Sequence, residues 1–309
     1  MAWDFELLAG PFGGTAEGPA WDGQALLFTH IPESRIMRYD PARGEVSVHR
    51  TDTKNTNGLM FDAQGRLYGC QSGDFRIVRF EPDGSQTPLP NELDGKRHNR
   101  PNDLAIDSQG RIYFSDPFGR GRPDGERQLD HASVLRHTPQ ADGGWKLERM
   151  TFDTTSPNGV LLSKDEKNLY VAQSDYDGTR ELRAYPIQDD GTLGACVTLH
   201  TFGNDHRGVQ RGVDGMCLDS DGNIVACAGW DEAGPGPMIY VFASNGRVIE
   251  THPVPVDRPT NCTFGGADLD TLFVTTGGGH FFRVRNTGRR GYNLYPRSPS
   301  ASPVLNYPG

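Results

Sequence analysis

The stretch that decides the fold is NGLMFDAQGRLYGC, residues 57–70. A polar residue opens it, and two short apolar runs follow on either side of the turn sequence DAQG. Two such runs around a glycine-containing turn are the signature of a β-hairpin. The same phrase returns in variant form at residues 17–29, 102–115, 158–172, 214–228 and 261–275. Its opening residues are therefore 40 to 56 positions apart, which indicates a repeat architecture.

Each repeat carries further strand-like segments behind its hairpin. Third and fourth apolar runs follow, such as SRIMRYD (34–40) and EVSVHR (45–50). Six repeats of four strands predict an all-β, six-bladed β-propeller with four-stranded antiparallel blades around a central channel. Helical periodicity is weak, which disfavours a TIM barrel or a Rossmann fold. We expect one propeller domain over residues 1–295, closed by a strand near residues 5–8, and a Pro/Ser-rich tail over residues 296–309.

The composition limits the partners of the chain. It has 309 residues, and 31 Lys and Arg against 40 Asp and Glu give a net charge of −9. An acidic surface disfavours nucleic-acid and anionic-membrane partners, because both require basic residues to neutralise phosphate. No apolar run approaches the roughly 20 residues that cross a bilayer, and no secretory signal is evident. We therefore expect a cytoplasmic protein whose five cysteines are reduced and act as small apolar residues.

The residues that open the six repeats share a chemical character. They are Glu17, Asn57, Asn102, Asn158, Asp214 and Asn261. The first strand of each blade lines the channel of a propeller, so we expect these residues to form a ring near one mouth. Asn and Asp also favour the turns that enter strands. That preference accounts for one or two of the positions, but not for six carboxylates or carboxamides that include a glutamate.

A ring of oxygen ligands around one axis suits a hard cation. Ca²⁺ accepts about six to eight oxygens from carboxylates, carboxamides, carbonyls and water. Glu17 and Asp214 would balance a divalent charge, and the neutral amides of Asn102 and Asn158 can complete the ligand shell. The ring contains neither His nor Cys, which disfavours Zn²⁺, whereas ligand type does not exclude Mg²⁺, Mn²⁺ or Fe²⁺.

Four phrases in this order and spacing carry a resemblance to a known family. They are AEGPAW (16–21), NRPND (99–103), PNGV (157–160) and VDGMCLD (213–219). The chain resembles the gluconolactonase/regucalcin (senescence marker protein) family of six-bladed propellers, and more distantly the paraoxonases and diisopropylfluorophosphatases. The resemblance extends over the whole chain up to the tail.

This resemblance implies a site and a reaction. It implies one divalent metal, usually calcium, bound at the channel mouth by Glu17, Asn158 and Asp214. It also implies that Arg100 and Asn102 contact the substrate. The reaction of the family is the hydrolysis of sugar lactones, with the aspartate at position 214 as the proposed general base. We therefore expect a metal-dependent, gluconolactonase-like hydrolase whose partner is a small lactone.

The chemistry of ring opening agrees with this expectation. A lactone is a cyclic ester, so its hydrolysis needs a nucleophile and a group that stabilises the developing oxyanion. A cation polarises the carbonyl, and Asp214 can accept the proton of a water molecule. Arg100 offers a planar fork of donors to sugar hydroxyls or to a carboxylate product. The alternative for Arg100 is a structural salt bridge with Asp103 or Asp116.

Several other residues receive supporting roles. Asp103 follows the third ring residue, and on a regular strand its side chain would point the opposite way. Asn57 and Asn261 could bond a metal ligand or a metal-bound water. His30 and His280 end strands of the first and last repeats, and such residues are more typical of structural hydrogen bonding than of catalysis. The irregular segment 118–131 is either part of a lid or an ordinary loop.

Two other functions stay open at this point. The same site could hydrolyse another ester or a phosphotriester, or the propeller could bind calcium or a protein without catalysis. The ring favours catalysis, because a scaffold needs no converging carboxylates. Burying like charges together is also costly unless a cation lies between them.

Overall fold

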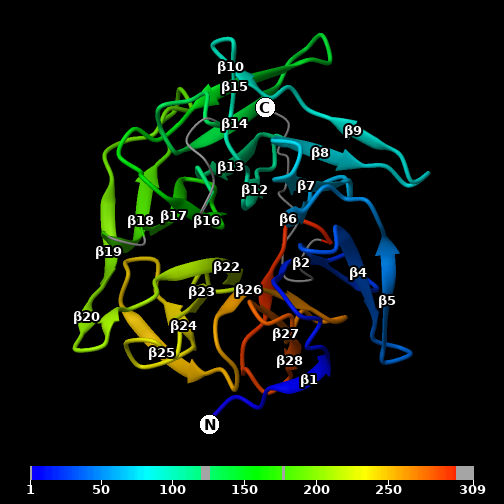
Figure 1. Ribbon diagram of the computed structural model, residues 1–309, viewed down its shortest axis with the longest axis vertical. Coiled ribbons are helices and arrows are strands. Elements are labelled where there is room, and N and C mark those ends of the chain that lie inside the picture. The colour runs from blue at the N-terminus through cyan, green and yellow to red at the C-terminus, as the bar shows by residue number, and fades with distance from the viewer. Residues whose placement is uncertain (1, 120–125, 176–177, 297–309) are drawn as a thin grey trace, which may run out of the picture.

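The computed structural model describes residues 2–119, 126–175 and 178–296. Six antiparallel sheets of four or five strands are arranged as blades around a central channel (Figure 1). The predicted six-bladed β-propeller is therefore confirmed. The described residues contain no helix that is long and apolar enough to cross a membrane.

Within the first five blades, the strands follow one another in the chain from the channel outward. The first blade contains β2 (Ala16–Trp21), β3 (Leu26–His30), β4 (Arg35–Asp40) and β5 (Glu45–Arg50). The second contains β6 (Thr56–Phe61), β7 (Leu67–Gln71), β8 (Arg76–Phe80) and β9 (Gln86–Pro88). The third contains β12 (Leu104–Ile106), β13 (Ile112–Asp116), β14 (Ser133–Pro139) and β15 (Trp145–Arg149). The fourth contains β16 (Pro157–Leu162), β17 (Asn168–Ser174), β18 (Arg180–Pro186) and β19 (Val197–Phe202). The fifth contains β22 (Val213–Asp219), β23 (Ile224–Ala228), β24 (Met238–Phe242) and β25 (Val248–Pro253). Short hairpins are formed by β10 (Glu92–Leu93) with β11 (Lys96–Arg97) and by β20 (Asn204–Asp205) with β21 (Gly208–Val209).

The sixth blade joins the two ends of the ring. It contains β26 (Pro259–Gly265), β27 (Thr271–Thr276) and β28 (Phe281–Val284), and its outer strand is β1 (Glu6–Ala9) from the start of the chain. β1 pairs antiparallel with β28, and Arg283 forms an ion pair with Glu6 at 2.6 Å. The strand expected near residues 5–8 is thus present, and it closes the propeller by tying the first residues to the last blade.

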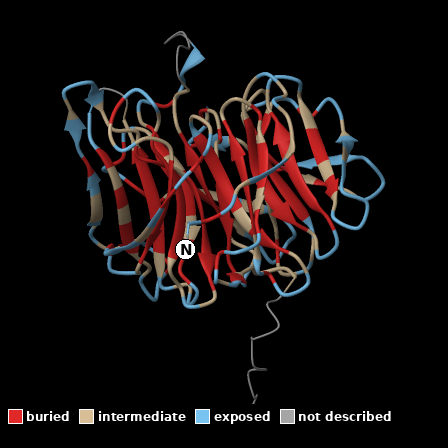
Figure 2. Cartoon of the chain, turned by 90° about the horizontal axis from the view of Figure 1, so that it is seen from below, coloured by how far each residue is buried: buried red, intermediate tan, exposed pale blue. Residues whose placement is uncertain are grey.

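The core lies between the faces of neighbouring blades. The inner strands are almost fully buried, whereas the outer strands and the connecting loops are exposed (Figure 2). Between the first and sixth blades, the rings of Phe28 and Phe281 stack with centroids 4.4 Å apart, and the Tyr39 ring packs against Phe281. Each such side chain contributes about 1.5–3 kcal/mol when it leaves water. Packing between the blades therefore holds the inner strands in fixed positions around the channel.

The inner strands are irregular where the ring residues lie. In five of them the pairing register shifts at or next to the opening residue, as it does between Glu17 and Ala20 in β2. A β-bulge of this kind re-aims the side chains around it. Four of the six opening residues are also followed by glycine. The Gly58 N–H donates to the Asn102 carbonyl of the next blade at 2.8 Å, so neighbouring inner strands touch at this level.

The last described segment lies at the other end of the channel. Strand β29 (Gly291–Tyr292) pairs with the free edge of β22, which makes the fifth blade five-stranded. The Asn293 side chain then donates to the Phe264 carbonyl at 3.1 Å, and the Tyr295 ring packs against Phe61. In Figure 1 this red segment runs near the middle of the ring. Of the predicted tail, residues 297–309 lie outside the described part of the chain.

Candidate active site

The structure brings most of the predicted ring together. The Glu17 carboxylate is close enough to Asp214 and Asp103 for their negative charges to repel it, and it accepts a hydrogen bond from the Asn261 side chain. Asn158 in turn forms a hydrogen bond with Asp214. Four of these five side chains lie on inner strands, and the fifth, Asp103, lies directly before β12. The channel thus brings together residues that are up to more than two hundred positions apart in the sequence. Of the other two ring residues, Asn57 lies on β6, and Asn102 lies in the loop two positions before β12.

Glu17 is a buried carboxylate in this group. It is 5% exposed, and burial raises its pKa well above the ordinary value, with repulsion from Asp214 and Asp103 adding to the effect. The Gly18 N–H donates to its Oε2 at 2.7 Å, and this bond together with that from Asn261 opposes the shift. A carboxylate that is both buried and repelled by two others is the arrangement that a positive charge relieves.

Asp103 also faces the channel, which corrects an expectation from the sequence. On a regular strand it would point away, but β12 begins only at Leu104, so strict alternation does not apply at the preceding residue. Asp103 lines the cavity inside the channel and accepts hydrogen bonds from the Leu104 N–H, at 3.0 Å, and the Val160 N–H. Burial raises its pKa to about 7, and the charge of Asp214 contributes to that rise.

Asp214 has a cationic partner that sequence analysis missed. Burial raises the pKa of Asp214, while the guanidinium of Arg211 and the hydrogen bond from Asn158 act in the opposite direction. Arg211 contacts Asp214 Oδ2 directly and also donates to the Pro259 carbonyl at 2.8 Å. The sequence spacing of Arg211 and Asp214 is only a weak indication of this ion pair. In an extended chain, residues three positions apart point to opposite sides, so the two side chains can touch only where the backbone bends.

The donor set fits a hard divalent cation. The Oδ1 atoms of Asn57 and Asn158 are buried and have no hydrogen-bond partner, which is costly unless something else bonds them. The Asn158 side chain also bonds the carboxylate of Asp214, whose charge acts on the buried Glu17. No group of three His, Cys, Asp or Glu side chains in residues 2–119, 126–175 and 178–296 is arranged to hold a metal by itself. A cation here would therefore depend on carboxamide oxygens as well as carboxylates, which is typical of calcium ligation.

Arg100 lies in the loop before β12 and is held from three sides. It donates to the Ser72 carbonyl at 2.8 Å and to Glu126 Oε2 at 2.7 Å, and its guanidinium lies over the Phe75 ring at 4.3 Å. The alternative of a salt bridge from Arg100 to Asp103 or Asp116 is wrong, because its carboxylate partner is Glu126. Glu126 belongs to the segment 118–131, of which residues 120–125 lie outside the described part of the chain.

Asp116, the other carboxylate considered for Arg100, has different partners. Its Oδ1 lies 3.0 Å from His98 Nδ1, and its Oδ2 accepts the Asn99 N–H at 2.7 Å. All three residues are buried at the end of β13 and in the loop that follows β11. This arrangement holds the loop that carries Arg100 against the third blade.

The remaining predicted residues have structural surroundings. His30 is buried against the Phe12 ring at 5.6 Å, and His280 Nδ1 lies 3.3 Å from the Thr276 hydroxyl. The cysteines are free thiols, as expected, and Cys217 and Cys262 contact each other through sulfur atoms 3.7 Å apart. These contacts are of the kind that pack a core.

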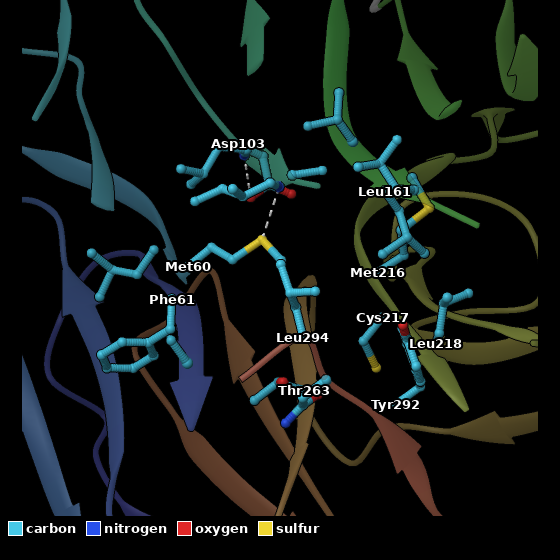
Figure 3. A pocket seen from close by; sticks show the side chains of 18 of the residues that line it. Met60, Phe61, Asp103, Leu161, Met216, Cys217, Leu218, Thr263, Tyr292 and Leu294 are labelled. Carbon is cyan, nitrogen blue, oxygen red and sulfur yellow. Dashed lines mark hydrogen bonds between the residues drawn. The ribbon is translucent and has the colours of Figure 1, made fainter. Parts of the chain in front are cut away.

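A cavity of about 130 Å³ lies beneath the polar ring. Asp103 and Asn261 are its polar lining on the ring side, and its walls include Met60, Met216 and Leu294 (Figure 3). The Met60 side chain reaches toward the neighbouring third blade, where its sulfur accepts the Ile106 N–H at 3.2 Å. The site therefore has a polar mouth over an apolar floor, which limits the water that can reach the carboxylates from below.

Comparison with known proteins supports the family resemblance noted in the sequence, and the match covers most of the chain. The family model of the SMP-30/Gluconolactonase/LRE-like region matches residues 15–278. A solved gluconolactonase from Xanthomonas campestris has a TM-score of 0.76 and 31% identity, over 91% of this chain and 89% of that one. The gluconolactonase of Zymomonas mobilis is 28% identical over 281 residues, which cover 84% of this chain and 75% of that protein. Regucalcin of Xenopus laevis is 27% identical over 280 residues, or 84% and 82% of the two chains. The chain therefore belongs to the SMP-30/Gluconolactonase/LRE-like family.

Proposed function

We propose that this protein is a metal-dependent hydrolase that opens a sugar lactone at the polar mouth of its channel. The observation that carries the proposal is the buried cluster of Glu17, Asp103 and Asp214, set beside carboxamide oxygens that have no partner. The gluconolactonases among the relatives support the substrate class. The cytoplasmic location expected from the sequence stays a prediction.

The ligands in this proposal are Glu17, Asn158 and Asp214. Their oxygens are hard donors, and two negative charges match a divalent cation, so Ca²⁺ is the favoured ion. The unpartnered Asn158 Oδ1 supports this choice, because a carboxamide oxygen is an ordinary calcium ligand. A bound divalent cation would supply the positive charge that polarises the lactone carbonyl and stabilises the oxyanion.

The residues of the chain perform the rest of the reaction. Asp214 accepts the proton of the attacking water as general base, and the Asn158 hydrogen bond orients its carboxylate. Asn102 and Arg100 bind the sugar hydroxyls on the side of the third blade. Arg100 is suited to this role because Ser72, Glu126 and Phe75 already fix its guanidinium, so little side-chain freedom is lost when substrate binds.

The test is turnover on a panel of substrates with and without divalent cations. Protein stripped with EDTA is assayed by the acid released from aldonolactones of five- and six-membered rings, from an aryl ester and from a phosphotriester. We expect hydrolysis of at least one aldonolactone, loss of that activity after stripping, and recovery with Ca²⁺ or another divalent ion. Activity confined to the ester or phosphotriester would replace the substrate class, and no activity on any substrate would favour a binding role.

Cation binding by itself provides a second check. A ligand bound only by the folded protein raises the melting temperature. We therefore expect Ca²⁺ to raise the Tm of stripped protein, and the triple variant Glu17→Gln, Asn158→Ala, Asp214→Asn to lose this response. An unchanged Tm of the wild-type protein in millimolar Ca²⁺, Mg²⁺ and Mn²⁺ would contradict the metal site.

A further inference from the structure

We propose that Arg211 is a fixed counter-ion that competes with the divalent cation for Asp214 and so sets how tightly this site binds the cation. The inference rests on the proposed metal site, and it concerns a residue outside the predicted ligand set. Its basis is the position of the guanidinium, which contacts one oxygen of the Asp214 carboxylate.

Arg211 is anchored so that its charge stays in place. Its guanidinium donates to the Pro259 carbonyl at 2.8 Å and to the Gly229 carbonyl at 3.3 Å, in addition to Asp214. The backbone adds a further bond, because the Gly229 N–H donates to the Arg211 carbonyl at 2.9 Å. Two neighbouring blades therefore hold this side chain, and only 15% of it is exposed.

The charge of Arg211 has opposite consequences for the two states of the site. Without a cation, it partly neutralises a cluster in which Glu17, Asp103 and Asp214 repel one another, so it stabilises the cation-free fold. With a divalent cation on Asp214, the cation and the Arg211 guanidinium would both contact the same carboxylate. Their mutual repulsion would be strong, because solvent screens charges poorly where little water reaches them. The same side chain should therefore raise the stability of the empty site and weaken cation binding.

This pair of opposite effects separates the proposal from a purely structural role. A residue that only positioned Asp214 would, when removed, lower the stability of the cation-free protein and also weaken cation binding. A competing counter-ion would, when removed, lower the stability of the cation-free protein and strengthen cation binding. The sign of the change in cation affinity decides between the two roles.

The experiment is a Ca²⁺ titration of EDTA-stripped protein by calorimetry at pH 8, with Tm measured in parallel. The variants are Arg211→Gln, which removes the charge, and Arg211→Lys, which keeps it. The matched control is Arg258→Gln: Arg258 lies just before β26, is half exposed and pairs with Asp257 at 3.1 Å, so its loss removes a nearby surface charge without touching the cluster.

We expect Arg211→Gln to lower the Kd for Ca²⁺ at least tenfold and to lower the Tm of the stripped protein, with Arg211→Lys and Arg258→Gln within threefold of the wild-type Kd. If Arg211→Gln does not fold without cation, the Ca²⁺ dependence of its refolding gives the Kd of the folded variant once the unfavourable folding equilibrium is included. Equal or weaker binding by Arg211→Gln, with wild-type binding intact, would overturn the counter-ion role and leave the metal site standing. No binding by wild type or variant would remove both proposals, whereas binding by the variant alone would support the counter-ion role.

Discussion

Gly58 lies so close to Asp103 that a Cβ atom placed on it would be 2.6 Å from Asp103 Oδ1. The two residues belong to neighbouring blades, and the lack of a side chain at position 58 lets the blades meet at the level of the carboxylate cluster. The glycine that follows an opening residue is therefore a condition for the site as well as for the turn of the strand.

The first prediction concerns this contact. Gly58→Ala should destabilise the protein by about 1–3 kcal/mol, because the added methyl group meets the Asp103 side chain and nearby backbone. Turnover should fall as well, since Asp103 must move. Urea unfolding and a lactone assay measure the two effects. Gly203→Ala is the control, because a Cβ there would have no atom within 4 Å; equal losses in both variants would contradict the explanation.

The second prediction concerns the general base. Asp214→Asn should reduce kcat at least about a hundredfold, because a carboxamide cannot accept the proton of the attacking water. The near-isosteric change should leave the circular dichroism spectrum unchanged. Asp221→Asn serves as the control, since Asp221 is exposed in the turn between β22 and β23 of the same blade. A wild-type rate for Asp214→Asn on every hydrolysed lactone would remove the assignment.

The third prediction concerns acid stability. His137 in β14 is fully buried between the rings of Phe114 and Trp145, and neither of its ring nitrogens has a hydrogen-bond partner. Burial, together with the nearby His98, lowers the pKa of His137 to about 3. In the unfolded chain an ordinary histidine has a pKa of about 6.5. The unfolded state therefore binds the extra proton between these two values, and stability falls as the pH drops below about 6.5.

The measurement for His137 is the unfolding free energy at pH 8 and pH 5. His137→Phe should make the loss between these values smaller by about 2 kcal/mol, from about 1.4 kcal/mol per pH unit over roughly 1.5 units. His206→Gln, at an exposed position, is the control and should leave the loss unchanged. The same acid sensitivity in His137→Phe as in the wild type would mean that other groups account for it.

The fourth prediction concerns the segment at the far end of the channel. Leu294 lines the cavity beneath the ring, so Leu294→Ala should destabilise the protein by about 2 kcal/mol, at the lower end of the range for buried leucines. Leu7→Ala is the matched control, because Leu7 is 49% exposed on β1. Denaturant titration measures both variants. A loss at Leu294 no larger than that at Leu7 would show that the segment adds little to the core.

The sequence predicts the parts of this structure that repeat. Six copies of one hairpin phrase are enough to predict the blades, and the opening residues of those copies mark the polar mouth, because propeller geometry places equivalent residues around one axis. The orientation of Asp103 could not be predicted in this way, since it depends on where β12 begins. The alternation rule holds only inside a regular strand.

Contacts between segments that are distant in the chain also could not be predicted from the sequence. Arg211 reaches Asp214 because the Pro259 carbonyl on the next blade holds its guanidinium, and no local pattern contains that carbonyl. Strand β29 likewise has no hairpin partner in the sequence, because it pairs with β22 some seventy residues earlier. Both features depend on tertiary packing, which cannot be read from the residue pattern of a segment that occurs only once in the chain.

The position of the segment 291–296 also bears on how substrate could enter the channel and how product could leave it. It bonds β22 and β26 and then packs against Phe61 and beside Gly23, so it crosses one end of the channel from the fifth blade to the first and second. Because the segment covers this end, the proposed lactone substrate and its acid product would both use the polar mouth, where Glu17 and Asp214 lie. The residues around the polar mouth would therefore influence both the entry of substrate and the release of product.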